Sequence, residues 1–205
     1  MMNDQIVTIS REFGSGGRLI GKKLADHMGV PYYDKELLNR IAEESGFSRE
    51  MMEEAEMKAK STFFYSLSSA LGSGESGSDG LSLNERFFIA QFETIRRVAE
   101  EGSCVIVGRC ADYVLRGIKG TTNIFIYAET EDKIKRAIEE YGVSEKDVKR
   151  IMSDTDKARA NYYNYHTGNK WGAHVNYNLS IDSGYISIDN SVKLIETYLE
   201  LKSER

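Results

Sequence analysis

Apolar residues occur along the chain in two patterns, as short runs and as helical stripes, and the order of these patterns predicts the fold. Short apolar runs at 5–10, 104–108 and 123–128, with a weaker run at 178–182, predict strands. The second and third runs are almost continuously apolar, as expected for strands that are buried on both faces of a parallel sheet. Because helical patterns separate the runs, the chain is predicted to be an α/β protein.

Apolar stripes predict two helices with clear ends. The first ends at Gly29, because Pro31 cannot continue it. The second, at 84–101, starts with a capping box of Ser82 and Glu85 and is apolar enough to suit either the core or the surface of a homodimer. The predicted buried stripes are Ile20, Leu24 and Met28 in the first helix and Phe88, Phe92, Ile95 and Ala99 in the second.

The most informative segment is 6–21, I-V-T-I-S-R-E-F-G-S-G-G-R-L-I-G, where a β-branched run passes through glycines straight into the first helix. Glycines adopt backbone angles closed to other residues, so successive N–H groups can converge on an anion at the helix start. The segment predicts a phosphate-binding loop, and a glycine-rich turn without a ligand is the simpler alternative. The predicted loop residues are Gly14, Ser15, Gly16, Gly17 and Arg18.

This loop departs from the P-loop pattern G-x-x-x-x-G-K-[ST]. Alignment with the pattern places Arg11 at the first glycine, Gly17 at the lysine and Arg18 at the Mg²⁺-binding hydroxyl. Two defining side chains are therefore missing, and the metal ligands stay unknown. Arg18, or Lys22 one helical turn later, is the candidate source of the positive charge.

Composition narrows the class of protein without choosing a chemistry. The chain has 205 residues, of which 40% are hydrophobic and 29% charged, and this suits one compact domain. The chain has two cysteines, which lack paired C-x-x-C spacing, and no leader is recognisable. Both observations favour a cytoplasmic protein. No apolar run approaches the roughly 20 residues of a membrane span. A net charge of −5 argues against a nucleic-acid partner.

Two regions interrupt the regular pattern. The sequence at 72–80, G-S-G-E-S-G-S-D-G, is typical of a passive linker or of the hinge of a moving segment. The region 146–171 interleaves basic residues with tyrosines and Trp171. These rings could stack on a base, although their packing onto the domain is the simpler expectation.

Arg109 and Asp34 each follow a predicted strand, at 104–108 and 30–33. Both should therefore lie at the carboxyl edge of the sheet, where open α/β sheets bind their ligands. The planar fork of Arg109 suits a phosphate, and an ion pair with a structural carboxylate is the alternative. Asp34 can accept from a ribose hydroxyl or from an arginine, or it can cap the helix that follows.

Asp156 and Arg159 lie three residues apart on a predicted helix and so share a face. If this helix closes over the site, Arg159 can clamp a transferring phosphoryl group, while Asp156 holds the acceptor or orients the arginine. Otherwise the two form a surface ion pair worth well under about 1 kcal/mol. The spacing alone does not decide between these alternatives.

Four segments taken in order carry a family resemblance. They are 9–21 (I-S-R-E-F-G-S-G-G-R-L-I-G), 31–34 (P-Y-Y-D), 104–112 (C-V-I-V-G-R-C-A-D) and 156–163 (D-K-A-R-A-N-Y-Y). Together they resemble the divergent cytidylate kinase-like group of P-loop kinases over nearly the whole chain. The resemblance implies a P-loop NTPase-type three-layer sandwich with a parallel five-stranded sheet and a helical lid. It also implies transfer of the γ-phosphoryl group of ATP, with Mg²⁺, onto CMP or dCMP.

The resemblance extends to individual residues. Asp34 and Arg40 match a family pattern D-x-G-x-x-Y-R that holds the acceptor, although Glu36 and Asn39 replace its glycine and tyrosine. The implied organisation is a single domain, 1–205, with a mobile acceptor-side helical insertion at 45–82 and a lid at 144–172.

Two further family motifs are present in altered form. Arg109 matches the arginine of a G-R-D motif whose aspartate is replaced by Cys110. Asp156 and Arg159 match the later half of R-D-x-x-D-x-x-R, whose first two residues differ here. The acceptor is thus expected to contact Asp34, Arg40, Arg109 and Asp156.

The prediction is therefore a cytoplasmic nucleoside monophosphate kinase that uses Arg18, Arg109 and Arg159 for catalysis. A nucleotide-binding regulatory protein with little transfer activity is an alternative, because the loop lacks its lysine and hydroxyl. A small-molecule kinase with another acceptor is a second alternative, because the acceptor motifs are altered.

Overall fold

The computed structural model describes residues 5–34, 37, 39–41 and 83–204. The predicted insertion at 45–82, the linker at 72–80 and Ser82 of the predicted capping box lie outside these residues.

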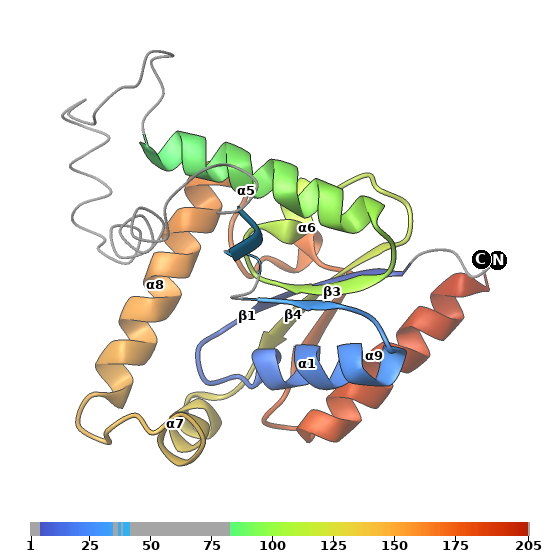
Figure 1. Cartoon of the computed structure of the whole chain (residues 1–205). Coiled ribbons are helices and arrows are strands. Elements are labelled where there is room, and N and C mark those ends of the chain that lie inside the picture. The colour runs from blue at the N-terminus through green and yellow to red at the C-terminus, as the bar shows by residue number, and fades with distance from the viewer. Residues whose placement is uncertain (1–4, 35–36, 38, 42–82, 205) are drawn as a thin grey trace.

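Within the described residues, five parallel strands form one sheet in the order β2-β3-β1-β4-β5 (Figure 1). The central strand pairs on both sides, so that Ile6 lies opposite Cys104 on one neighbour and Thr121 on the other. The predicted strands are confirmed with small shifts at their ends. Their bounds are β1 (Ile6–Arg11), β2 (Tyr32–Tyr33), β3 (Cys104–Val107), β4 (Thr121–Tyr127) and β5 (Leu179–Asp182).

Helices cover both faces of the sheet and complete a three-layer sandwich (Figure 1). One face carries α1 (Gly17–Met28) and α9 (Ile188–Ser203), and the other carries α5 (Leu83–Glu100) and α6 (Ala111–Val114). Beyond the carboxyl end of β1 lie α7 (Thr130–Glu139) and α8 (Val148–Thr167), and the short η1 (His174–Asn176) precedes β5. None of the described helices has both the length and the apolar composition needed to cross a bilayer.

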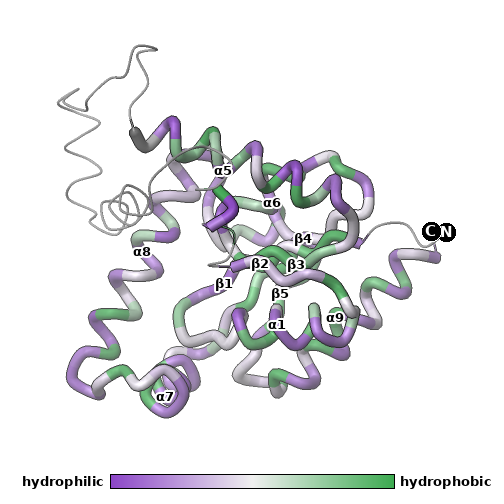
Figure 2. The backbone as a smooth tube through the Cα atoms, in the orientation of Figure 1, coloured by the Kyte–Doolittle hydropathy of each residue, from purple (hydrophilic) through white to green (hydrophobic). Residues whose placement is uncertain are grey.

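The side chains of β3 explain its continuous apolar sequence. Cys104 and Ile106 point into the core beneath α5 and α6, whereas Val105 and Val107 point into the core beneath α1 and α9. All four are buried. Figure 2 shows the hydrophobic stretches of the chain gathered at the sheet and on the inner sides of the helices.

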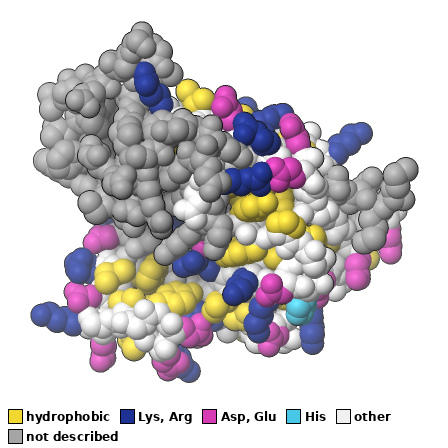
Figure 3. All heavy atoms as spheres, in the orientation of Figure 1, with side chains coloured by type: hydrophobic (Ala, Val, Ile, Leu, Met, Phe, Trp, Pro, Cys, Tyr) yellow, Lys and Arg dark blue, Asp and Glu magenta, His cyan; other side chains and the backbone are white. Residues whose placement is uncertain are grey.

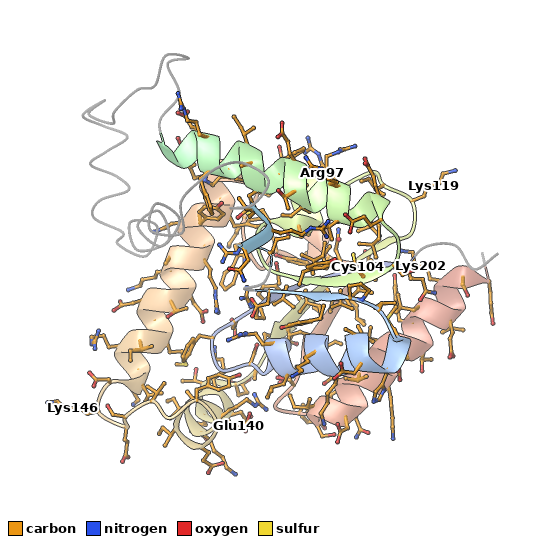
Figure 4. The ribbon with its side chains drawn as sticks, in the orientation of Figure 1. Arg97, Cys104, Lys119, Glu140, Lys146 and Lys202 are labelled. Carbon is orange, nitrogen blue, oxygen red and sulfur yellow. The ribbon has the colours of Figure 1, made fainter. Side chains whose placement is uncertain are left out.

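The predicted end of the first helix is confirmed, since Gly29 is the left-handed C-cap of α1. At the other end of the chain, Lys202 of α9 donates to the carbonyl of Thr121 at 2.6 Å and to the hydroxyl of Thr122 at 2.7 Å (Figure 4). This contact joins the last helix to the start of β4, at the amino edge of the sheet.

The buried face of α5 agrees with the prediction except at its first residue, Phe88. Phe87 lies in the core with 5% of its surface exposed, whereas Phe88 is only half-buried. The Phe88 ring stacks on His166 of α8, with 4.0 Å between ring centroids. The predicted stripe is thus confirmed at Phe92, Ile95 and Ala99, which lie in or against the core, whereas Phe88 lies against α8.

Candidate active site

The loop between β1 and α1 lies at the carboxyl edge of the sheet and packs closely against α7. Gly14 and Gly16 adopt φ angles of 77° and 76°, in the left-handed region that favours glycine. A Cβ atom on Gly14 would lie 2.6 Å from the carbonyl oxygen of Lys133. These two glycines are therefore required both by the turn and by its contact with α7.

The carbonyl groups of this loop are held by side chains from distant parts of the sequence. The Gly14 carbonyl accepts from Arg136 Nη1 at 2.7 Å, and the Ser15 carbonyl accepts from the hydroxyl of Ser183. None of the described peptide bonds is cis, so the N–H of Gly16 points away from Ser183. No described side chain caps the first turn of α1, whose amides are thus available to an anion.

Two arginines pair with one carboxylate beside the loop, and the charges of two more act on one of them. Asp34, whose side chain is 7% exposed, lies 3.7 Å from Arg11 Nη2 and 2.5 Å from Arg18 Nε. The positive charges of Arg159 and Arg109 also act on the Arg11 guanidinium. Asp34 is thus ion-paired with Arg11 and Arg18, in line with the arginine-binding role that was one of those predicted for it.

Arg11 is the most constrained member of this cluster. The pKa of Arg11 is lowered to about 9, mainly by burial and then by the positive charge of Arg159, while Asp34 acts in the opposite direction. Its Nε atom is buried and has no hydrogen-bond partner among the described residues. A buried guanidinium whose charge is incompletely balanced favours an anion such as phosphate. The sequence pattern marked Arg11 only as a departure from the P-loop and assigned it no role.

Asp156 and Arg159 of α8 reach back to the loop. Asp156 Oδ1 accepts from the Phe13 amide at 2.7 Å and from Arg159 Nη1 at 3.0 Å. Arg159 Nη1 also donates to the Arg11 carbonyl at 3.2 Å. Burial raises the pKa of Asp156 and lowers that of Arg159. The pair is therefore part of the loop's surroundings and not an isolated surface ion pair.

The first helix after β4 adds cations that the sequence pattern did not single out. Lys133 of α7 binds Glu12 of the loop at 2.8 Å, and its side chain is only 11% exposed. Arg136, one turn further along α7, binds the loop carbonyl described above. The available signal was a lysine and an arginine three residues apart in the helix that follows a buried strand.

Arg109 lies at the carboxyl end of β3, as predicted, in an unusual backbone turn. Arg109 and Cys110 have φ angles of 61° and 55°, which cost non-glycine residues about 1–2 kcal/mol each. The buried Gln91 of α5 donates to the Arg109 carbonyl at 3.1 Å and so helps to hold this conformation. The turn places Arg109 close enough for its charge to act on Arg11.

Two candidate residues lie apart from the arginine cluster. Arg40 pairs with Glu101, with 2.8 Å between Nη1 and Oε2, and donates to the Tyr33 hydroxyl at 3.2 Å. Because Glu101 precedes β3, this pair lies toward the amino edge of the sheet. Lys22 is exposed on α1. The structure brings neither of them to Asp34.

The aromatic side chains of the 146–171 region mostly pack onto the domain, which was the simpler of the two predictions. The Tyr163 hydroxyl donates to the buried Asp112 at 2.6 Å. Trp171 meets the Phe125 ring edge to face, with 5.4 Å between centroids. Tyr165 differs, since 55% of its surface is exposed.

The described residues do not fit a protein-held Mg²⁺ ion. They contain no group of three or more His, Cys, Asp or Glu side chains suited to a metal. The carboxylates nearest the loop each bind a cation instead, in the pairs Asp34–Arg18, Glu12–Lys133 and Asp156–Arg159.

Charge is distributed evenly elsewhere on the visible surface. On the face seen in Figure 3, basic and acidic side chains are interspersed.

Comparison with known proteins agrees with this geometry. The pattern of the Cytidylate kinase-like family matches residues 6–185. An uncharacterized protein from Eubacterium ventriosum ATCC 27560 shares 32% identity and a TM-score of 0.72, over 96% of this chain and 98% of that one. No curated protein matches the chain.

Two shikimate kinases share the fold at lower identity. The enzyme from Bacteroides thetaiotaomicron is 17% identical, with a TM-score of 0.53 over 96% of this chain and 98% of that one. The enzyme from Acinetobacter baumannii, solved in complex with shikimate, is 10% identical, with a TM-score of 0.54 over 98% and 96%. The predicted P-loop kinase fold is confirmed, and family and fold together support a nucleotide-dependent kinase.

Proposed function

Because the chain belongs to the cytidylate kinase-like family, we propose that it transfers the γ-phosphoryl group of ATP to a nucleoside monophosphate, with CMP and dCMP as first candidates. The observation that carries this proposal is the pairing of Arg11 and Arg18 with Asp34 beside the glycine loop, with Arg109 and Arg159 near enough for their charges to act on Arg11. Phosphoryl transfer is catalysed mainly by positioning and by cations aimed at the moving charge. This cluster supplies such cations at one place.

The proposed roles follow from the position of each group. The amides of the first turn of α1 hold the ATP phosphates, and Arg18 turns from Asp34 to join them. This movement is open to Arg18 because its side chain is 51% exposed. Arg109 binds the phosphate of the acceptor. Arg159, oriented by Asp156 at 3.0 Å, neutralises charge on the transferring group.

A kinase with another small acceptor is the second candidate. Arg40, expected to hold a nucleoside monophosphate, binds Glu101 instead, and the buried Cys110 replaces an acceptor-binding aspartate. Phosphate handling is therefore better supported than recognition of a base or a sugar. A regulatory nucleotide-binding protein remains the third candidate, since Gly17 replaces the loop lysine.

A coupled assay of ADP formation tests these candidates together. Purified protein with ATP and Mg²⁺ is given CMP, dCMP, the other nucleoside monophosphates or shikimate, and water alone is the control. We expect ADP formation well above ATP hydrolysis with one nucleoside monophosphate. Turnover with shikimate alone would favour the second candidate. Nucleotide binding in a calorimeter without turnover of any acceptor would favour the third and contradict the proposal.

A further inference from the structure

The side chain of Arg11 runs across two glycines that leave room for it. A Cβ atom on Gly17 would lie 2.5 Å from Arg11 Cβ and 3.0 Å from its Cγ, and a Cβ atom on Gly108 would overlap Arg11 Nη1. Arg11 therefore passes from the end of β1, over the start of α1, to the end of β3. At the far end of this path its guanidinium reaches Asp34.

Residues 11 and 17 exclude each other's side chains. The 2.5 Å approach involves the Cβ atom of Arg11, which cannot move away without the backbone. A lysine at residue 17 therefore cannot be accommodated while residue 11 carries a side chain. In the P-loop pattern, residue 11 is the first glycine and residue 17 is the lysine. This chain has the opposite arrangement, with the cation at residue 11 and the glycine at residue 17.

The charge balance around Arg11 points to an anionic ligand. Asp34 is shared with Arg18, and the nearby Arg109 and Arg159 repel the Arg11 guanidinium. The buried Nε atom of Arg11 has no partner among the described residues. A phosphoryl group beside the loop would balance this charge and supply the missing acceptor.

We propose that Arg11 takes the place of the absent P-loop lysine and binds the phosphoryl groups of the nucleotide held by the glycine loop. This inference rests on the proposed function and adds a residue to it. The cation approaches the phosphates from β1 instead of from the first turn of α1. An arginine can bind two oxygens of one phosphate through parallel N–H groups held in a fixed plane, a geometry that a lysine lacks.

Exchange of the two residues tests the inference. Arg11→Gly removes the cation, Gly17→Lys adds one against the Arg11 Cβ atom, and the double variant Arg11→Gly/Gly17→Lys restores the ordinary pattern. We expect Arg11→Gly to lower kcat about 100-fold or more and to weaken ATP binding. Gly17→Lys alone should lower the melting temperature. The double variant should recover at least about tenfold of the loss in kcat, because the lysine then has room.

Two further variants separate charge from packing. Arg11→Met keeps most of the side-chain volume without the charge. Arg150→Met is the matched control, because it removes an exposed arginine on α8 that pairs with Asp147. ATP affinity, measured by calorimetry, should fall for Arg11→Met and stay unchanged for Arg150→Met. A folded Arg11→Met protein with normal ATP affinity and normal kcat would overturn the inference.

The result also separates this inference from the proposed function. If the wild-type protein binds ATP but phosphorylates no acceptor, the proposed function fails, and the ATP affinities still decide the role of Arg11. If the wild-type protein is an active kinase and the Arg11 variants match it, the inference alone fails.

Discussion

At the residue scale, the candidate site is built on arginines that two described carboxylates hold in place. Asp34 is shared by Arg11 and Arg18, while Asp156 binds Arg159 and the Phe13 amide. In each pair, the carboxylate holds an arginine in place without balancing the charge of the whole cluster. This arrangement favours a ligand that brings negative charge with it, since buried charges are stable only when they are paired.

Arg159 should matter more for transfer than for binding of ATP. Its guanidinium is positioned by Asp156 and by the Arg11 carbonyl, so little reorganisation is needed as charge moves. We expect Arg159→Met to lower kcat about 100- to 1,000-fold, with a much smaller change in the dissociation constant of ATP. Steady-state kinetics and calorimetry would measure the two effects.

Arg150→Met serves as the matched control for this prediction. Arg150 lies on the same helix, but its side chain is 66% exposed and pairs with Asp147 at 3.0 Å. It should leave both quantities unchanged. Equal losses in Arg159→Met and Arg150→Met would show that α8, and not the Arg159 charge, was perturbed.

At the scale of elements, α8 contacts the rest of the domain along one face. Asp156, Arg159, Tyr163 and His166 lie three or four residues apart, so their side chains share this face. The first two contact the loop, Tyr163 contacts Asp112 and His166 stacks on Phe88. The position of Arg159 therefore depends on anchors along the whole helix.

The His166 anchor should make stability depend on pH. Burial lowers the pKa of His166 to about 4, below the value of about 6.5 for an unfolded histidine. Between these values the unfolded chain binds the extra proton, so the free energy of unfolding falls as the pH falls from about 6.5 toward 4. The contribution is fully present above this window.

Thermal unfolding at pH 7 and pH 4.5 would measure this effect. The wild-type protein should lose more stability between the two values than His166→Phe, which keeps an aromatic ring against Phe88 but does not titrate. His174→Phe, at an exposed position in η1, is the control and should behave like the wild type. An equal loss in all three proteins would assign the pH dependence to other groups.

At the scale of the whole molecule, all five strands of the described sheet contribute to the site at their carboxyl ends. The loop follows β1, Asp34 follows β2, and Arg109 follows β3. Lys133 and Arg136 lie on the helix after β4, and Ser183, which binds the Ser15 carbonyl, follows β5. A ligand at this edge would therefore be linked to every strand, as in other open α/β sheets.

A phosphate-bearing ligand should accordingly stabilise the protein as a whole. ATP at about 100 times its dissociation constant adds about 2.7 kcal/mol to the free energy of unfolding. For a chain of this length the melting temperature should rise by roughly 5–10 °C. We expect ATP to raise it most, ADP less, and adenosine hardly at all. An equal rise with adenosine would contradict phosphate binding at the loop.

Local patterns were sufficient for most of the elements and for part of the site. The strands, the end of α1 at Gly29 and the shared face of Asp156 and Arg159 are properties of neighbouring residues, and the structure confirms them. The position of Arg109 could also be predicted from the sequence, because a residue that follows a buried parallel strand must lie at the carboxyl edge of the sheet. By contrast, Phe88 was wrongly assigned to the core face of α5, because its contact with α8 is not local.

The sequence by itself thus determined an α/β chain with a glycine loop between its first strand and helix, since periodicity and backbone freedom act over a few residues. Only the tertiary structure decided which charges meet. Strand order brings Asp34 close to Arg11 and packs the Arg11 side chain against Gly17 and Gly108. It also pairs Arg40 with Glu101. Such pairings join residues far apart in the chain, and their free energies depend on burial and distance, which no local pattern encodes.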